Sequence, residues 1–389
     1  MRREYLKLAM GEVRRGRGLG LMRHALKVPL FHAGRMIGRP LTGPFQAIVL
    51  VTYRCNLLCQ HCDLPLYARS QKGRRDELTT GAFRAVIDDY AALGAPAIGF
   101  AGGEPFVRPD LLDLVRHTRE SGMLAHIATN GMLWSDGDLA AMMASGLDGV
   151  SVSIDGARAE THDLIRARKG AFEETLAALR RFLAARRAAG GGPVLNVNCA
   201  IGQANYREVP ELVERLLGLG VDGVGFMPIQ ESGIDFKNRD RFADLRVRDA
   251  DGIETVLARL ETMRRSGVPI DNSTAYLRTL RAFFRGQPLP VACTAGLHTC
   301  VVDCYGDVYP CIPYSNRRRA VGNIADTPLR AMWRGEAYAR MRRETAACRD
   351  CFWNCHTELT LALAGGRVPR LADAAVAGDS AGPGKEKAA

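Results

Sequence analysis

Short apolar runs recur from residue 45 onward, with stretches of helical spacing between them. The runs read as continuously apolar, and they lie at 47–51, 97–101, 124–128, 149–154, 194–201 and 223–228. The helical stretches lie at 80–93, 110–121, 136–145, 172–187 and 208–219. Strands without a polar face that are joined by helices indicate a parallel sheet covered on both sides. Six such units predict an α/β fold with a partial (β/α)6 TIM-like barrel, whose strand ends carry the chemistry.

The pattern changes at three points along the chain, which predicts four regions. Residues 45–285 hold the barrel, and residues 286–364 form a small, cysteine-rich C-terminal domain. Residues 1–44 form a basic amphipathic leader that precedes the first strand. Residues 365–389 are rich in Ala, Gly and charged residues without a sustained period, which is typical of a disordered tail.

Composition narrows the class of protein. The 389 residues are 47% apolar, which is enough for a full-sized core. No run of about 18 apolar residues occurs, and residues 1–10 carry charges where a signal peptide needs an apolar stretch. We therefore expect a cytoplasmic protein.

Much of the net charge of +11 lies in the leader, where ten Lys or Arg among the first forty residues face two acidic residues. Apolar residues interleave with these cations, so short amphipathic helices can meet the inner face of an anionic membrane or an anionic substrate. Alternatively, the leader packs over the bottom of the barrel and leaves its arginines in solvent. Nucleic acid is disfavoured as a partner, because the sequence has no nucleic-acid-binding motif and the leader has few aromatic residues.

The eleven cysteines are clustered. Three lie within residues 55–62, seven lie within residues 293–355, and Cys199 stands alone in an apolar run. In a chain of this size without a secretion signal, such clustering favours metal thiolates over a disulfide framework. Cys199 is expected to be an inert thiol of the core.

The first group, Cys55, Cys59 and Cys62, follows the first strand with three and two intervening residues. This spacing lets one loop hold three corners of a cubane iron-sulfur cluster and leaves one iron without a protein ligand. A structural zinc site would need a fourth ligand nearby, and a redox dithiol would leave one cysteine spare. His61 is a conceivable fourth ligand, but it directly precedes Cys62 and is expected to point away.

Cys-x3-Cys-x2-Cys after a first strand resembles the radical S-adenosylmethionine (radical SAM) superfamily, and further motifs extend the resemblance over residues 45–228. The Gly-Gly-Glu-Pro stretch after the second strand resembles the motif that meets the amine of the methionine moiety. Residues at the third and fourth strand ends resemble positions near the cofactor, and a later arginine resembles the one that pairs with its carboxylate. The resemblance therefore implies that S-adenosylmethionine (SAM) is bound by Gly102, Gly103, Glu104, Pro105, Asn130, Ser153, Asp155 and Arg166.

Taken singly, these residues have simpler interpretations. A Gly-Gly pair is a turn, Asp155 can cap the next helix, and Arg166 can be an exposed arginine. Arg168 is a close rival of Arg166 for the carboxylate. Asn198 and Met227 either touch the adenosine or are core residues of their strands.

The C-terminal cysteines form a pattern that resembles the auxiliary-cluster domains called SPASM, or their shorter twitch form. The pattern is Cys293-x12-Gly306-x4-Cys311, then Gly322-Asn323-Ile324, then Cys348-x2-Cys351-x3-Cys355, with Cys300 and Cys304 inside it. Two fully ligated clusters need eight cysteines, whereas seven lie here. Either one auxiliary cluster has spare thiols, or two are present and one iron is open.

We expect at least one auxiliary cluster on Cys293, Cys311, Cys351 and Cys355. The roles of the other metal-ligand candidates, Cys300, Cys304 and Cys348, stay open. Zinc is the alternative metal, because paired cysteines are also typical of zinc ribbons. His298 and His356 could ligate either metal, but both are expected at the surface.

The resemblance also implies a mechanism. A reduced 4Fe-4S cluster cleaves SAM to a 5'-deoxyadenosyl radical that takes hydrogen from a substrate, while the protein binds, orients and excludes water. An auxiliary cluster favours a net oxidation or a bond-forming modification. Expected partners are a reductant such as flavodoxin or ferredoxin and a peptide, protein or lipid-like substrate. A non-catalytic iron-sulfur or zinc protein, acting as a redox sensor or electron carrier, would explain the cysteines but not the polar residues at successive strand ends.

Overall fold

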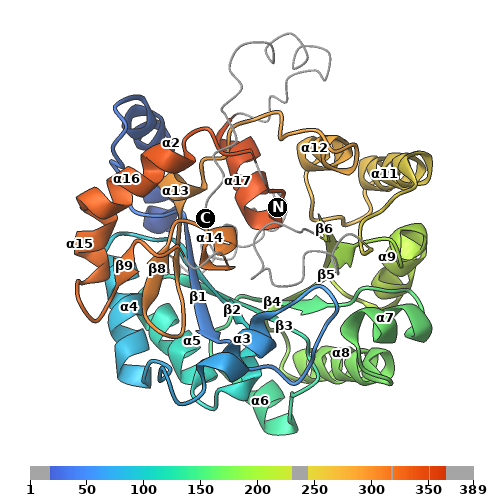
Figure 1. Ribbon diagram of the computed structural model, residues 1–389. Coiled ribbons are helices and arrows are strands. Elements are labelled where there is room, and N and C mark those ends of the chain that lie inside the picture. The colour runs from blue at the N-terminus through green and yellow to red at the C-terminus, as the bar shows by residue number, and fades with distance from the viewer. Residues whose placement is uncertain (1–17, 230–243, 317–318, 350, 365–389) are drawn as a thin grey trace.

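The computed structural model describes residues 18–229, 244–316, 319–349 and 351–364. Its centre is a nine-stranded sheet with the order β6-β5-β4-β3-β2-β1-β7-β8-β9 (Figure 1). The first six strands are mutually parallel and differ from the predicted runs by at most one residue at either end. They are β1 (Gln46–Thr52), β2 (Ala97–Gly102), β3 (Leu124–Thr129), β4 (Gly149–Ser153), β5 (Val194–Ile201) and β6 (Gly223–Pro228).

Helices cover the outer face of these strands (Figure 1). The five predicted helices are confirmed as α4 (Thr80–Ala92), α5 (Leu111–Glu120), α6 (Asp136–Ala144), α8 (Ala171–Ala188) and α9 (Val209–Leu219). Local chemistry fixes their starts: Ser135 and Asp138, for example, form a reciprocal capping box at the first turn of α6. The sequence did not predict α3 (Leu64–Gln71) and α7 (Ala159–Arg166), which flank the cysteine loop. Two further helices, α11 (Ala250–Arg265) and α12 (Thr274–Phe284), follow β6.

The C-terminal region continues the sheet rather than standing apart from it. β7 (Thr299–Val302) pairs in parallel with β1, and the short β8 (Asp307–Tyr309) and β9 (Gly322–Asn323) add antiparallel strands at the edge. The remaining helices of this region are α13 (Ala295–His298), α14 (Ile312–Asn316), α15 (Leu329–Arg334), α16 (Glu336–Thr345) and α17 (Asn354–Leu363). The Tyr90 hydroxyl of α4 donates to the Cys300 carbonyl of β7 at 3.0 Å, so barrel and C-terminal region share one core.

Part of the leader packs against the C-terminal region. α2 (Gly18–Met36) places the buried ring of Phe31 edge-on to Phe45 at 5.8 Å, and 6.4 Å from the ring of His298. Within the described residues, no helix combines the length and apolar character needed to cross a bilayer. Residues 1–17 and the predicted disordered tail at 365–389 lie outside the described residues.

Candidate active site

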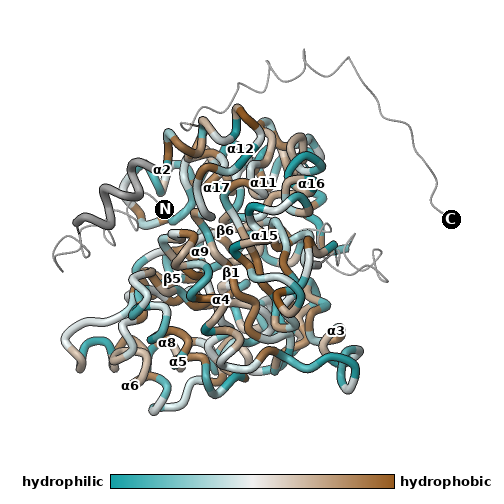
Figure 2. Tube along the Cα trace, turned by 90° about the vertical axis from the view of Figure 1, so that its left-hand side faces the viewer, coloured by the Kyte–Doolittle hydropathy of each residue, from teal (hydrophilic) through white to brown (hydrophobic). Residues whose placement is uncertain are grey.

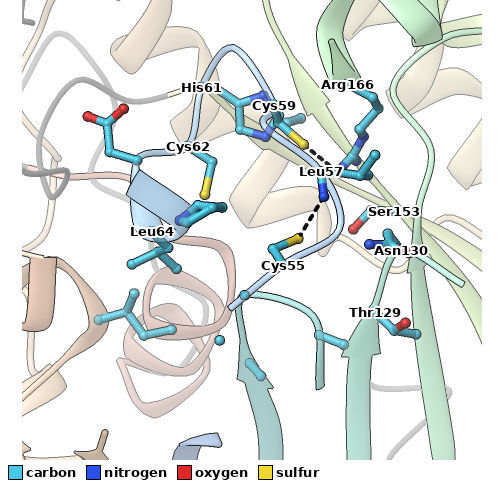
Figure 3. A pocket seen from close by; sticks show the side chains of 18 of the residues that line it. Cys55, Leu57, Cys59, His61, Cys62, Leu64, Thr129, Asn130, Ser153 and Arg166 are labelled. Carbon is cyan, nitrogen blue, oxygen red and sulfur yellow. Dashed lines mark hydrogen bonds between the residues drawn. The ribbon is translucent and has the colours of Figure 1, made fainter. Parts of the chain in front are cut away.

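The first cysteine group lies in the loop between β1 and α3, with its thiols facing one cavity (Figure 3). Backbone hydrogen bonds fix the loop: Cys62 donates to the Cys59 carbonyl at 3.1 Å, and Gln60 donates to the Ile165 carbonyl of α7 at 2.9 Å. The Leu57 amide also donates to the Cys55 sulfur at 3.4 Å. Burial raises the pKa of Cys55 to about 11 and that of Cys62 to about 12, so a bound cation is needed to hold them as thiolates.

Gly102 and Gly103 bring the end of β2 against this loop. A Cβ atom at Gly102 would lie 2.1 Å from the Thr52 carbonyl oxygen, and one at Gly103 would lie 2.2 Å from the Arg54 oxygen. Gly102 also has a φ of +131°, which disfavours any side chain. Both glycines border the cavity, so their close approach leaves backbone atoms exposed to a ligand there.

Glu104 and Pro105 do not border this cavity, in contrast to the expectation from the resemblance. The buried Glu104 carboxylate accepts from the Thr129 hydroxyl at 2.7 Å, the Asn130 amide at 2.7 Å and the Phe106 amide at 3.1 Å. Burial raises the pKa of Glu104, and these donors oppose the rise. Glu104 therefore ties the end of β3 to the end of β2, and it acts on the cavity through Asn130.

Asn130 and Ser153, at the ends of β3 and β4, both border the cavity (Figure 3). The Asn130 side-chain amide donates to the Asn56 oxygen in the cysteine loop at 2.7 Å, and its own oxygen accepts from the Met132 amide at 2.9 Å. Asn130 thereby holds the end of β3 against the cysteine loop at the edge of this opening.

Asp155 and Arg166 form a buried ion pair, with 2.7 Å between Asp155 Oδ2 and Arg166 Nη2. Asp155 does not border the cavity, and its other oxygen accepts from the Ala200 amide at 2.8 Å. Arg166 does border it, with Nη1 at 3.8 Å from the Cys59 sulfur. Burial alone lowers the pKa of Arg166, but the Asp155 carboxylate raises it above its ordinary value. Arg168, the rival position, points away and pairs with Glu174 at 2.8 Å.

The cavity has a volume of about 290 Å³ and is closed from two sides. Met227, Pro228 and Ile229 approach from the end of β6, whereas Ile312 and Trp353 approach from the C-terminal region. Of the two positions left open, Met227 borders the cavity and Asn198 does not.

The second cysteine group gathers around a much smaller space. Cys293, Cys311, Cys348 and Cys351 border a cavity of about 20 Å³ together with His356. Cys355 lies beside them: burial raises its pKa to about 11, and the nearby Cys293 thiol adds to that rise. Five of the seven C-terminal cysteines are therefore neighbours. In both groups the sulfurs surround an opening, and no three His, Cys, Asp or Glu side chains of the described ranges lie close enough to hold a single metal ion.

Two family profiles match the chain over these two cysteine groups. The profile of the radical SAM superfamily matches residues 49–216, and that of SPASM, an iron-sulfur cluster-binding domain, matches residues 293–352. This chain is a radical SAM enzyme with a SPASM domain. Its cofactors are SAM and 4Fe-4S clusters, one in the barrel and at least one in the SPASM domain.

Relatives of this radical SAM enzyme share most of its length. The AdoMet-dependent heme synthase of Methanosarcina barkeri is 28% identical over 75% of this chain and 83% of its own. The PqqA peptide cyclase of Xanthomonas campestris pv. campestris (strain 8004) is 29% identical over 79% of each chain. The crystal structure of Streptococcus suis SuiB bound to its precursor peptide SuiA has a TM-score of 0.63 at 14% identity, covering 86% of this chain and 79% of SuiB. At that identity, the SuiB structure demonstrates a shared fold.

The residues of this radical SAM enzyme fit the cofactors on structural grounds. Three thiols face one opening, a glycine turn leaves its backbone uncovered, and a buried guanidinium stands beside Cys59. The Arg166 Nε is buried and has no hydrogen-bond partner among the described residues, which is the kind of donor that a carboxylate satisfies.

Two predicted metal ligands are not brought to the second group. Cys300 is buried in β7, where burial raises its pKa to about 11 beside the Tyr90 and Tyr338 hydroxyls, and Cys304 is buried just beyond that strand. Neither borders the C-terminal cavity. Strand pairing with β1 turns these two thiols into the shared core, so the structure does not support them as metal ligands. Cys199 is fully buried in β5, as predicted.

The prediction that His298 and His356 lie at the surface is wrong. Both are buried, and they are joined through threonine hydroxyls: His298 Nδ1 lies 2.8 Å from Thr299 Oγ1, which lies 3.3 Å from His356 Nδ1. Burial lowers the pKa of His356 to about 3. The Ile312 amide donates to His356 Nε2 at 3.3 Å, so Nδ1 carries the proton and faces the Cys355 sulfur at 3.8 Å. His356 therefore serves as a hydrogen-bond donor next to the second cysteine group.

Proposed function

We propose that this radical SAM enzyme holds its catalytic cluster on Cys55, Cys59 and Cys62 and abstracts hydrogen from a substrate bound under the SPASM domain. The observation that carries the proposal is the cavity of about 290 Å³, which all three thiols border together with strand ends β2 to β4 and two SPASM residues, Ile312 and Trp353. When bound, the reduced cluster supplies one electron that cleaves SAM and yields the 5'-deoxyadenosyl radical.

The protein residues bind and orient SAM. The uncovered backbone of Gly102 and Gly103 faces the methionine amine, and Asn130 and Ser153 position the remainder of the cofactor. Arg166 binds the carboxylate through its unpartnered Nε, while Nη2 stays on Asp155 and keeps the guanidinium plane fixed. Ile229, Ile312 and Trp353 exclude water from the reacting atoms.

The test is anaerobic reconstitution with iron and sulfide, reduction, addition of SAM and measurement of 5'-deoxyadenosine. A Cys55/Cys59/Cys62→Ala variant is the control. Formation of 5'-deoxyadenosine in the wild type and its loss in the variant support the proposal. Equal formation in both would place the catalytic cluster elsewhere.

A peptide or protein side chain is the substrate that we favour. A neighbouring cavity of about 510 Å³ shares Ile229 with the SAM cavity and Cys351 with the second cysteine group. An extended chain lying there would present one side chain to the SAM cavity and still reach the auxiliary cluster. The PqqA peptide cyclase relative fits this arrangement.

A heme-type macrocycle is the second candidate, favoured by the side chains that border the same neighbouring cavity. Phe283, Phe284 and Phe352 offer apolar faces, and Arg246 and Arg349 offer two cations for carboxylates. The heme synthase relative fits this arrangement. Titration with heme, followed by absorbance, separates the two: micromolar binding that weakens at least about tenfold in Arg246→Gln/Arg349→Gln supports the macrocycle. Weak heme binding, or heme binding that the two arginine substitutions do not change, would favour a peptide substrate. That substrate would then be tested with short peptides encoded beside the gene.

We also propose that residues around the end of α2 contact the inner membrane surface. Val28, Leu30, Met36, Ile37 and Leu41 are exposed, and the exposed Arg35 and Arg39 lie among them in the sequence. Apolar insertion combined with cations suits an anionic lipid surface. Sedimentation with vesicles containing phosphatidylglycerol tests this contact, and binding that survives deletion of residues 1–40 would contradict it.

A further inference from the structure

A basic cavity of about 490 Å³ borders the cysteine loop on the side away from the SAM cavity. We call it the basic cavity; it lies between the end of β1, α3, the segment at residues 72–77 and Tyr305 of the SPASM domain. Cys55 and Pro65 border both this cavity and the SAM cavity. Cys55 and Pro65 therefore form a wall between the basic cavity and the proposed site of the catalytic cluster.

The charge of the basic cavity is positive. Its border carries Arg54, Arg69, Lys72 and Arg75 against Asp76 and Glu77. Arg54 pairs with Glu77 at 3.0 Å, and Arg75 pairs with Asp307 at 2.7 Å. Arg69 and Lys72 are exposed and form no ion pair with any residue that the structure describes. Figure 2 shows the chain beside α3 as a hydrophilic stretch at the edge of the molecule.

The SPASM domain holds this surface in place. Arg75 stacks on the ring of Tyr305 at 4.7 Å and donates to the Tyr305 carbonyl at 3.2 Å. The Leu78 amide donates to the Cys304 carbonyl at 2.7 Å. The segment after α3 is therefore anchored at its far end, which pre-arranges the cations around Cys55.

We propose that the basic cavity is the docking surface for an acidic one-electron carrier protein. The inference rests on the proposed function, in which the cluster on Cys55, Cys59 and Cys62 receives an electron. The carrier loses one electron and the cluster gains one, and no atom is transferred. Opposite charge steers such transient partners into brief, small contacts, and this surface admits them without opening the substrate cavities.

Charge and access favour this surface over the one beside the second cysteine group. The cavity of about 20 Å³ there is bordered by no Lys or Arg of the described residues. The cations that share a cavity with Cys351, Arg246 and Arg349, border the proposed substrate cavity, where a docked carrier would block the substrate. At the basic cavity an acidic carrier meets Arg69 and Lys72, which form no ion pair among the described residues, beside one thiol.

The test compares two charge reversals in the reconstituted full chain. Arg69→Glu/Lys72→Glu changes the basic cavity, and Arg180→Glu/Arg187→Glu makes the same change of net charge on the exposed face of α8, away from the cavity. Anaerobic stopped-flow absorbance follows reduction of the cluster by reduced flavodoxin, and separately by photoreduced deazariboflavin, a small uncharged reductant.

We expect flavodoxin to reduce Arg69→Glu/Lys72→Glu at least about tenfold more slowly than wild type in low salt, while Arg180→Glu/Arg187→Glu changes less than about twofold. Raising the salt to about 1 M, where the screening length falls to about 3 Å, should remove most of the difference. Equal slowing in both variants, or no slowing in the first, would overturn the proposed surface.

The small reductant separates this inference from the proposed function. Normal reduction and SAM cleavage with deazariboflavin in Arg69→Glu/Lys72→Glu show that the cluster and active site are intact, so that slow reduction by flavodoxin reflects docking alone. Loss of SAM cleavage with deazariboflavin in the wild type would refute the proposed function itself.

Discussion

The two cysteine groups differ in the space and charge around them. Cys55, Cys59 and Cys62 border about 290 Å³ together with Asn130 and Arg166. Four of the five clustered C-terminal cysteines border about 20 Å³ with mostly apolar neighbours, and Cys355 lies beside them. The first group offers three thiols and room for another ligand, whereas the second offers more thiols than one cluster needs and almost no room. We infer that ligand exchange belongs to the barrel and that the SPASM site is closed.

The charges beside the thiols support the same contrast. Burial raises the pKa of thiols in both groups, to about 11 for Cys55 and about 11 for Cys355. In the barrel, however, the Arg166 guanidinium lies 3.8 Å from a thiol, whereas His356, with a pKa lowered to about 3, is neutral beside Cys355. A fixed cation suits the binding of an anionic carboxylate, whereas a neutral hydrogen-bond donor suits a cluster whose ligands are not exchanged.

The largest expected effect concerns cluster content. Cys311→Ala should remove one cluster, about four iron per chain, because Cys311 is fully enclosed among the C-terminal thiols. Cys300→Ala should keep all of its iron, because Cys300 lies in the core between Tyr90 and Tyr338. Iron and sulfide analysis after reconstitution measures both. Equal iron loss in the two variants would mean that Cys300 is a ligand after all.

The next effect concerns the buried ion pair behind the SAM cavity. Arg166→Met leaves the Asp155 carboxylate buried without its partner, which should lower the free energy of unfolding by about 3–5 kcal/mol. Asp155→Leu/Arg166→Met should recover most of that stability and still bind SAM at least about tenfold more weakly than wild type. Urea denaturation and equilibrium dialysis measure the two quantities.

Arg168→Met is the matched control, because Arg168 is exposed and its pair with Glu174 is a surface pair. We expect a change in unfolding free energy below about 1 kcal/mol and unchanged SAM binding. Weaker SAM binding in Arg168→Met than in the double variant would exchange the roles of the two arginines.

A smaller effect concerns acid stability in the two regions. Burial lowers the pKa of His162 in the barrel from 6.5 to about 4 and that of His298 in the SPASM domain well below its usual value. Below pH 6.5 the unfolded chain takes up protons that the folded chain refuses, so stability falls as the pH drops toward 4. Each histidine contributes up to about 1.4 kcal/mol per pH unit to the fall in the free energy of unfolding, and His162→Gln should remove the contribution of His162.

Urea denaturation at several pH values measures this slope and also shows whether the regions unfold together. Because β7 pairs with β1, we expect a single transition to which both histidines contribute. Two transitions, each sensitive to one histidine, would show that the shared sheet does not couple the barrel to the SPASM domain.

The barrel could be predicted from the sequence because apolar residues dominate each of its strands, even where Ser or Asn interrupts the run as in β4 and β5. The cysteine loop and Arg166 followed from motifs at strand ends. The strands β7, β8 and β9 could not be predicted, since they span only four, three and two residues. Each depends on pairing with its neighbour: β7 with β1, β8 with β7 and β9 with β8.

Long-range packing also explains why the positions of several other residues were predicted wrongly. His298 is buried because Phe31 from the leader and Thr360 from α17 cover it, and neither is near it in sequence. Cys300 and Cys304 face the shared core for the same reason. Glu104 turns toward β3 because three donors converge there, an arrangement that a four-residue motif does not encode.

The most direct test of the contrast between the groups is electron paramagnetic resonance of the reduced protein with and without SAM, in the wild type and in Cys55/Cys59/Cys62→Ala. We predict that SAM changes the wild-type spectrum, and that the variant keeps an auxiliary-cluster signal that SAM does not change. A variant signal that shifts on addition of SAM would show that the second group has an exchangeable site, and would contradict the account.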